Sequence, residues 1–170
     1  MKKILLLTFL LPLIAFSQPG KQMNDQKMKK AAFEKRITDK WQEYSKAFEY
    51  ADYNKIVSYF TYPVTFSILD DPRIINNEQE LIDVYKYMRS NVQKGYKYSI
   101  LDKSRIIWLS KEVFMVDATY SRYNEDYKRI YQGRGMYMYK KVEDGWKIFS
   151  ISSLPMIKNK KKKKTKSQTN

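Results

Sequence analysis

Residues 47–60, with the sequence AFEYADYNKIVSYF, decide how the chain begins to fold, because two helical patterns meet there. Apolar side chains before and within this stretch recur at the spacing of one buried helix face, at Ile37, Trp41, Tyr44 and Phe48. A second stripe of the same kind follows at Tyr53, Ile56, Val57 and Phe60. Pro63 stops this second pattern. We therefore predict a long helix, a shorter helix and then a short strand over residues 64–68.

A third helix and a run of strands are expected downstream. Asn77, followed three residues later by Glu80, has the form of a capping box before apolar residues at helical spacing, and Gly95 suits the end of that helix. The chain then becomes rich in aromatic and β-branched residues, as strands are, over residues 96–100, 105–109, 113–123, 127–142 and 146–152. The expected fold is α+β, a single domain in which a curved antiparallel sheet packs against the three N-terminal helices.

Two strings give this order of elements a family resemblance. AFEYADYNKIVSYF, followed by the strand PVTF, resembles the opening of the nuclear transport factor 2-like superfamily, which includes SnoaL-like and ketosteroid isomerase-like domains. GRGMYMYKKVEDGWKIFSIS, at residues 133–152, is similar to its final hairpin, so the resemblance covers about residues 37–154. It implies a cone-shaped sheet wrapped around the first helix, with a pocket opening at one end. The superfamily contains isomerases, dehydratases, cyclases, epoxide hydrolases and non-catalytic modules, so the fold alone does not fix an activity.

Residue matching disfavours an isomerase. Tyr44 falls where ketosteroid isomerases carry the tyrosine of their oxyanion hole, but the position of their base falls near Ile68 and that of their second acid near Gly135. Related dehydratases and cyclases use histidine, and this chain has His 0 and Cys 0. The same absences remove thiol nucleophiles, imidazole bases and the commonest zinc ligands. We predict no metal site and no cofactor.

Asp117 interrupts an otherwise apolar strand and is the one candidate base. Alternation places it on the same face of the strand as Met115 and Thr119. If that face lines the cone, burial would raise the pKa of Asp117 and suit it to general-base work, with Tyr44 as hydrogen-bond donor. The alternative is a structural ion pair with Arg105, Arg122 or Arg134.

Tyrosine is unusually frequent, with 15 residues, and it crowds the two long strands. Its large apolar face and polar tip suit a wall that binds sugars, aromatic molecules or lipid-like ligands, although strand packing explains the same composition. The candidate ligand-binding residues are Tyr44, Tyr59, Met115, Asp117, Thr119, Tyr131 and Tyr137. Gly133 and Gly135 flank Arg134, and we expect them to mark a bulge or bend, although they would also allow a ligand close to the backbone.

The N-terminal residues 1–17 have the form of a secretory signal peptide. Two lysines precede an apolar run, and Ala15 and Ser17 suit a cleavage site before Gln18. The run is shorter than the roughly 20 residues that a membrane-spanning helix needs. We expect an exported protein, periplasmic or extracellular, in which residues 18–35 form a linker or a frayed helix start and residues 36–157 form the domain.

Residues 158–170 contain seven lysines and no apolar side chain, so we expect a disordered tail. Without the tail and the signal, the formal charge of +15 falls to about +6. The tail would bind polyanions by counterion release, through Lys160, Lys161, Lys162, Lys163 and Lys164. An anionic envelope component is its expected partner, and a specific nucleic acid is not, since no readout motif is present. A merely solvated tail is the alternative.

Three functions follow for this chain. The first is a secreted or periplasmic module, without catalysis, that holds a small or elongated ligand in a tyrosine-rich pocket and forms a homodimer through its exposed sheet. The second is an isomerase, dehydratase or cyclase of the same fold with Asp117 as base. The third is an envelope-associated protein that acts through its basic tail.

Overall fold

A computed structural model describes residues 19–68 and 72–157. The chain divides into two compact units, Met1–Lys35 and Arg36–Asn170, and the boundary falls within helix α1 (Pro19–Glu49). In the first unit, the described residues are helical from Pro19 onward. The expected signal peptide and lysine tail lie outside the described residues.

Two capped helices follow α1 in the second unit. The Asp52 side chain accepts a hydrogen bond from the Lys55 backbone N–H and begins α2 (Tyr53–Val57), which ends before Phe60 rather than including it. Asn77 begins α3 (Glu78–Ser90) by accepting from the Glu80 N–H at 3.0 Å, and the Glu80 carboxylate accepts from the Asn76 N–H at 2.9 Å. The cap predicted from the sequence is therefore present as a variant of the capping box, in which Glu80 accepts from the residue before the N-cap.

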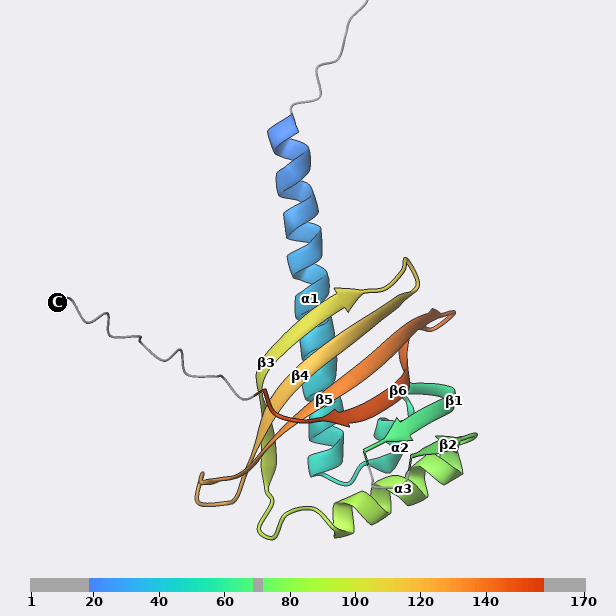
Figure 1. Cartoon of the computed structure of the whole chain (residues 1–170), viewed down its shortest axis with the longest axis vertical. Helices are drawn as coiled ribbons and strands as arrows, with labels where there is room; N and C mark the ends of the chain where they lie inside the picture. The colour runs from blue at the N-terminus through green and yellow to red at the C-terminus, as the bar shows by residue number, and fades with distance from the viewer. Residues whose placement is uncertain (1–18, 69–71, 158–170) are drawn as a thin grey trace, which may run out of the picture. The chain divides into compact units, whose positions relative to one another are not determined.

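Six strands form one curved sheet around the C-terminal part of α1 (Figure 1). In the order of their positions across the sheet they are β2 (Arg73–Ile75), β1 (Phe60–Ser67), β6 (Gly145–Leu154), β5 (Arg129–Val142), β4 (Val113–Tyr123) and β3 (Tyr98–Trp108). The α+β fold with a curved sheet and N-terminal helices is confirmed.

Three details of the sheet differ from the prediction. Strands β1 and β6 pair in parallel, so the sheet is mixed rather than antiparallel throughout. Strand β2 was not foreseen, because three residues are too few for a periodic pattern. Residues 98–108 form one strand instead of two, since an irregularity between Leu101 and Lys103 absorbs the polar residues that looked like a turn.

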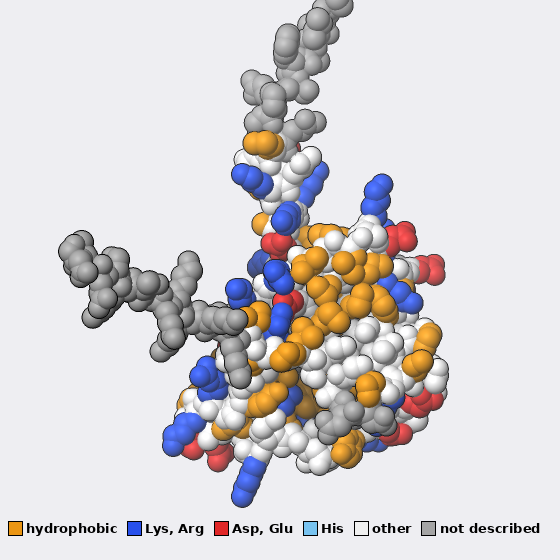
Figure 2. Space-filling model, in the orientation of Figure 1, with side chains coloured by type: hydrophobic (Ala, Val, Ile, Leu, Met, Phe, Trp, Pro, Cys, Tyr) orange, Lys and Arg blue, Asp and Glu red, His pale blue; other side chains and the backbone are white. Residues whose placement is uncertain are grey.

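The two faces of the sheet have different compositions. On β4, Phe114, Val116 and Ala118 are buried, with Tyr120 and Arg122 following on the same inner face, which packs against α1. The outer face carries Met115, Asp117 and Thr119 from β4. Figure 2 shows a diagonal band of hydrophobic side chains across the sheet face that is turned toward the viewer.

Aromatic rings fill the space between α1 and the inner face. Tyr85 from α3 is fully buried and contacts four rings, those of Tyr44, Phe48, Phe60 and Phe66, with centroids 5.8 to 6.2 Å from its own. Trp41 and Tyr44 of α1 both contact Tyr137 of β5. Most of the inner face is therefore occupied by the protein's own side chains, and this decides where a ligand can enter.

Candidate functional site

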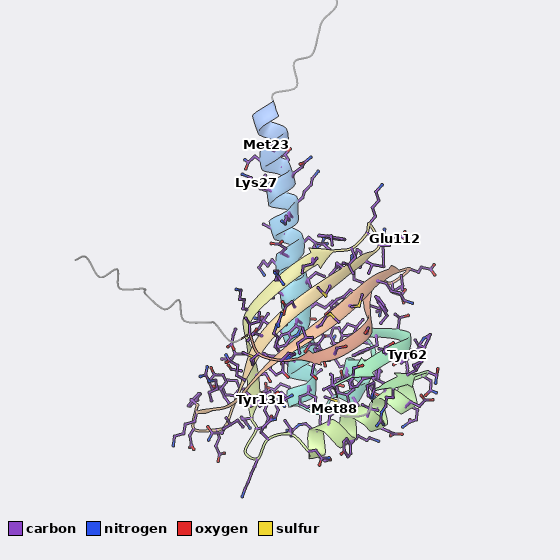
Figure 3. The ribbon with its side chains drawn as sticks, viewed as in Figure 1. Met23, Lys27, Tyr62, Met88, Glu112 and Tyr131 are labelled. Atoms are coloured by element: carbon purple, nitrogen blue, oxygen red, sulfur yellow. The ribbon has the colours of Figure 1, made fainter. Side chains whose placement is uncertain are left out.

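The inner face leaves a small pocket of about 50 Å³ at the end of the sheet where α1 ends. Its lining is aromatic on most sides, with three tyrosine hydroxyls, two serine hydroxyls and one cation: Trp41, Tyr44, Ser45, Phe48, Ile68, Met88, Ser99, Tyr120, Arg122 and Tyr137. Figure 3 labels Met88 of α3 and Tyr131 of β5, which both lie toward this end, whereas Glu112 lies at the opposite end of the sheet. No carboxylate lines this pocket.

Tyr44 of the pocket lining is hydrogen-bonded to a second buried phenol, Tyr85. The hydroxyls of Tyr44 and Tyr85 lie 2.6 Å apart and share one hydrogen bond. Burial raises the pKa of both phenols well above the usual value of 10, and burial likewise raises the pKa of Tyr137. These tyrosines stay protonated at neutral pH, so they offer hydrogen bonds and apolar surface but no base.

Arg122 is the cation of the site, and aromatic rings surround its guanidinium. The carbon Cζ lies 5.4 to 5.6 Å from the ring centroids of Phe48, Tyr96, Tyr120 and Tyr131, within the range of cation–π attraction. Nη1 donates to the Gln93 side-chain oxygen at 2.6 Å. Nε is buried and has no hydrogen-bond partner among the described residues. An unsatisfied buried donor typically costs about 1–3 kcal/mol, which an incoming acceptor would recover.

A larger groove adjoins this pocket. It has a volume of about 370 Å³ and lies between α1 and the edge strand β3, with walls of Trp41, Gln42, Lys46, Glu49, Tyr98, Ser99, Ile100 and Leu101. Trp41 and Ser99 line both cavities, so the two adjoin at these side chains. The arrangement can hold a compact head group in the pocket and a longer apolar body in the groove.

The candidate ligand residues divide between the two faces of the sheet. Tyr44 and Tyr137 line the pocket. The ring of Tyr131 lies over the Arg122 guanidinium, and the Tyr131 side chain is 38% exposed. Tyr59 is buried beside Tyr44, outside the pocket lining, and donates to the Glu43 carboxylate at 3.3 Å. Burial raises its pKa to about 12.

Met115, Asp117 and Thr119 lie on the outer face, away from Tyr44. Asp117 and Thr119 line a separate hollow of about 130 Å³ with Lys103, Arg105, Arg134 and Ile157. Because side chains alternate along a strand, the sequence correctly predicted that these three residues share one face of β4. It does not indicate which face of the strand is turned inward. The condition under which Asp117 was a candidate base, that its face lines the cone, is therefore not met.

Asp117 is held by two arginines. Arg134 donates through Nε to Oδ1 at 2.7 Å and through Nη2 to Oδ2 at 2.8 Å, and Arg105 donates to Oδ2 at 3.2 Å. The hydrogen bonds from Arg134 hold the pKa of Asp117 below its usual value. A carboxylate so paired is a poor proton acceptor, and the arrangement is the structural ion pair considered above.

We predict that Asp117→Asn lowers the thermal midpoint at pH 7 by about 2–4 °C, since it weakens a bidentate pair. A depressed pKa stabilises the folded state above the unfolded pKa of about 4, and this stabilisation is lost as the pH falls through the lower folded pKa. The difference between wild type and variant should therefore shrink below pH 4. Thermal unfolding followed by circular dichroism from pH 3 to 8 checks this, and a difference that is constant with pH would contradict it.

The two glycines beside Arg134 do not mark a bulge in the pairing of β4 with β5, which leaves the bend as the expected role. Gly133 pairs with Tyr120 and Gly135 with Ala118 in continuous register. A Cβ at Gly133 would lie 2.6 Å from Tyr131 Cε1 and 2.8 Å from Tyr120 Cζ. A glycine is needed at position 133 because the rings of Tyr131 and Tyr120, which cover Arg122, occupy the space that a Cβ would take.

Two negative findings apply to the described part of the chain. Residues 19–68 and 72–157 contain no cluster of three or more acidic, histidine or cysteine side chains arranged to hold a metal ion. No helix within these ranges is long and apolar enough to cross a membrane.

Comparison with known proteins places this architecture in a family. The family model described as NTF2-like protein (DUF6841) matches residues 31–156. The chain belongs to this family. No curated protein matches this NTF2-like chain.

Solved structures share the fold at low sequence identity. A domain of unknown function with a cystatin-like fold from Nostoc punctiforme has a TM-score of 0.59 and 13% identity, over 75% of this chain and 79% of that one. A protein proposed to be an aromatic ring hydroxylase, from Novosphingobium aromaticivorans, has a TM-score of 0.57 and 14% identity, over 74% and 92%. An NTF2-like protein of unknown function from Shewanella oneidensis has a TM-score of 0.54 and 16% identity, over 69% and 94%. Identities this low establish the fold alone.

Proposed function

We propose that this NTF2-like protein is a non-catalytic module that binds a small ligand at the end of its aromatic core. The observation that carries the proposal is the adjoining pair of cavities joined at Trp41 and Ser99. A pocket of about 50 Å³ is too small for a whole drug-sized ligand, since such ligands need about 300 Å³ or more. The groove of about 370 Å³ supplies that room, so the ligand is elongated, with one end in the pocket.

The lining favours binding over catalysis. The pocket has no carboxylate, and its buried phenols stay protonated because burial raises their pKa. The carboxylate considered as a base, Asp117, lies on the other face of the sheet and is paired with Arg134. A general base is therefore missing from the lining of the pocket, and the one carboxylate of the adjoining groove is that of Glu49.

We expect Ser99→Phe to weaken binding of N-phenyl-1-naphthylamine, a neutral apolar probe, about ten-fold or more. The new ring would block the junction of pocket and groove. Ser153→Phe is the matched control, because Ser153 is exposed on β6 outside both cavities. Probe fluorescence during titration measures both. Equal binding by the two variants would reject these cavities as the site, and no binding by the wild type would reject the proposal for apolar ligands.

The proposal also includes location and assembly. An exported protein would meet its ligand in the periplasm or outside the cell, and its lysine tail would hold it near anionic envelope surfaces. The half-buried Met115, Met136 and Met138 on the outer sheet face favour a homodimer through that face. Cell fractionation with and without residues 158–170, at low and high salt, tests the first two points, and analytical ultracentrifugation tests the third.

A further inference from the structure

The guanidinium of Arg122 has an unused hydrogen-bonding edge beside the pocket. Its Nη1 donates to Gln93, whereas Nε is buried without a partner and no described residue accepts from Nη2. Arg134 on the outer face shows what this edge does when it is used, since its Nε and Nη2 hold the two oxygens of Asp117. Arg134 and Arg122 lie on neighbouring strands. The Nε and Nη2 edge of Arg134 binds a carboxylate of the protein, whereas the same edge of Arg122 binds no carboxylate of the described residues.

The surroundings of Arg122 make a bound anion favourable. None of the described carboxylates forms an ion pair with Arg122, which is half-buried among four aromatic rings. A charge in such surroundings interacts more strongly with an opposite charge than it does in bulk water. Arg89 of α3 adds a second cation nearby, because its guanidinium lies 5.3 Å from the Tyr96 ring that Arg122 also contacts. The pocket therefore has one cation, Arg122, in a mostly aromatic lining, and a second cation, Arg89, nearby.

We propose that the ligand of this site is an organic carboxylate with an elongated apolar body, bound through the Nε and Nη2 edge of Arg122. This inference rests on the proposed function and names the class of its ligand. A planar carboxylate matches the two parallel donors. The small volume of the pocket favours the three heavy atoms of a carboxylate over the larger, tetrahedral phosphate group. The apolar body lies in the groove against Trp41, Ile100 and Leu101.

The test compares an acid with its neutral isostere. The probes are 4-phenylbutanoate and 4-phenylbutanamide, which differ in charge but hardly in size, and binding is followed by isothermal titration calorimetry on the full protein. We expect the wild type to bind the acid about ten-fold or more tightly than the amide, as expected for a charge-assisted bidentate contact. Arg122→Gln should abolish this preference, and Arg122→Lys should retain part of it.

Arg105→Gln is the matched control, because it removes an arginine of the outer face, where Arg134 still holds Asp117. It should bind both probes as the wild type does. Circular dichroism establishes that each variant is folded. If Arg122→Gln does not fold, Gln93→Leu gives a second test, since it removes the contact at Nη1 that holds the Nε and Nη2 edge in place. It should weaken binding of the acid but not of the amide.

The outcomes separate the inference from the proposed function. Equal binding of acid and amide by the wild type would overturn the carboxylate inference and leave a neutral-ligand site in place. An unchanged preference in Arg122→Gln would also overturn it, because the anion would then bind elsewhere. Inorganic phosphate that displaces the acid at equal concentration would assign the site to phosphates instead. Failure of both probes, together with failure of the neutral naphthylamine, would overturn the inference and the proposed function together.

Discussion

Tyr85→Ala is expected to destabilise the domain by about 3–5 kcal/mol, the usual cost of deleting a large ring from a closed core. Tyr85 is fully buried, and its ring packs against Tyr44, Phe48, Phe60 and Phe66. These rings come from α1 and β1, so a cavity at Tyr85 loosens the contact of α3 with both. Since domains of this size are stable by about 5–15 kcal/mol, the variant should unfold at a much lower urea concentration.

Tyr85→Phe separates the ring from its hydroxyl. It keeps the ring contacts but leaves the Tyr44 hydroxyl without its partner at 2.6 Å. The expected loss is about 1–3 kcal/mol, and the double variant Tyr44→Phe/Tyr85→Phe should lose less than the sum of the single losses, because no buried donor is left unpaired. Urea unfolding measures the free energy of unfolding of the wild type, both single variants and the double variant. A Tyr85→Ala protein as stable as Tyr85→Phe would contradict the packing argument.

The same pair sets an alkaline limit to stability. Burial raises the pKa of both phenols above that of an unfolded tyrosine, so the folded state is favoured fully below pH 10 and loses this advantage as the pH rises through the folded values. Both phenols are therefore protonated at neutral pH, and the stability they provide should decrease only in alkaline solution.

The sequence predicted the elements well and the site only in part. Helical spacing from Ile37 to Phe48 and the cap at Asn77 are local signals, and both appear as expected. The parallel pairing of β1 with β6 joins residues more than 80 positions apart in the sequence, and no local pattern encodes it. Tyr44 was proposed as a pocket residue from the family resemblance and Tyr137 from the crowding of tyrosines on the two long strands, and both side chains line the small pocket.

Arg122 was considered only as a partner of Asp117. A signal for its real position was present, because the even-numbered residues of β4, Phe114, Val116 and Ala118, form the more apolar face and Arg122 follows them by alternation. Asp117, on the odd-numbered face, drew attention because a carboxylate in an apolar strand is unusual. Its pairing with Arg134 depends on the register of β4 and β5, which the sequence does not state.

Gly133→Ala is expected to reduce both stability and ligand binding, because the glycine makes room for the rings that surround Arg122. The added methyl would lie 2.6 Å from Tyr131 Cε1 and 2.8 Å from the Tyr120 ring, so both rings must move. Tyr120 packs against Trp41 at 5.9 Å between ring centroids, so its displacement reaches the junction of the two cavities. Overpacking of this kind costs about 1–3 kcal/mol.

Binding of 4-phenylbutanoate should weaken about ten-fold, since the displaced rings no longer hold the Arg122 guanidinium in place. Adding Tyr131→Ala to Gly133→Ala removes the nearer clash, because Tyr131 is the more exposed of the two rings. The double variant should therefore regain part of the lost stability, and the sum of the single effects should overestimate its loss. Urea unfolding and calorimetry on the three variants provide both readouts. A Gly133→Ala protein with wild-type stability and affinity would show that the two rings have other positions open to them, and the close fit of Tyr120 and Tyr131 over Arg122 would then have no part in recognition.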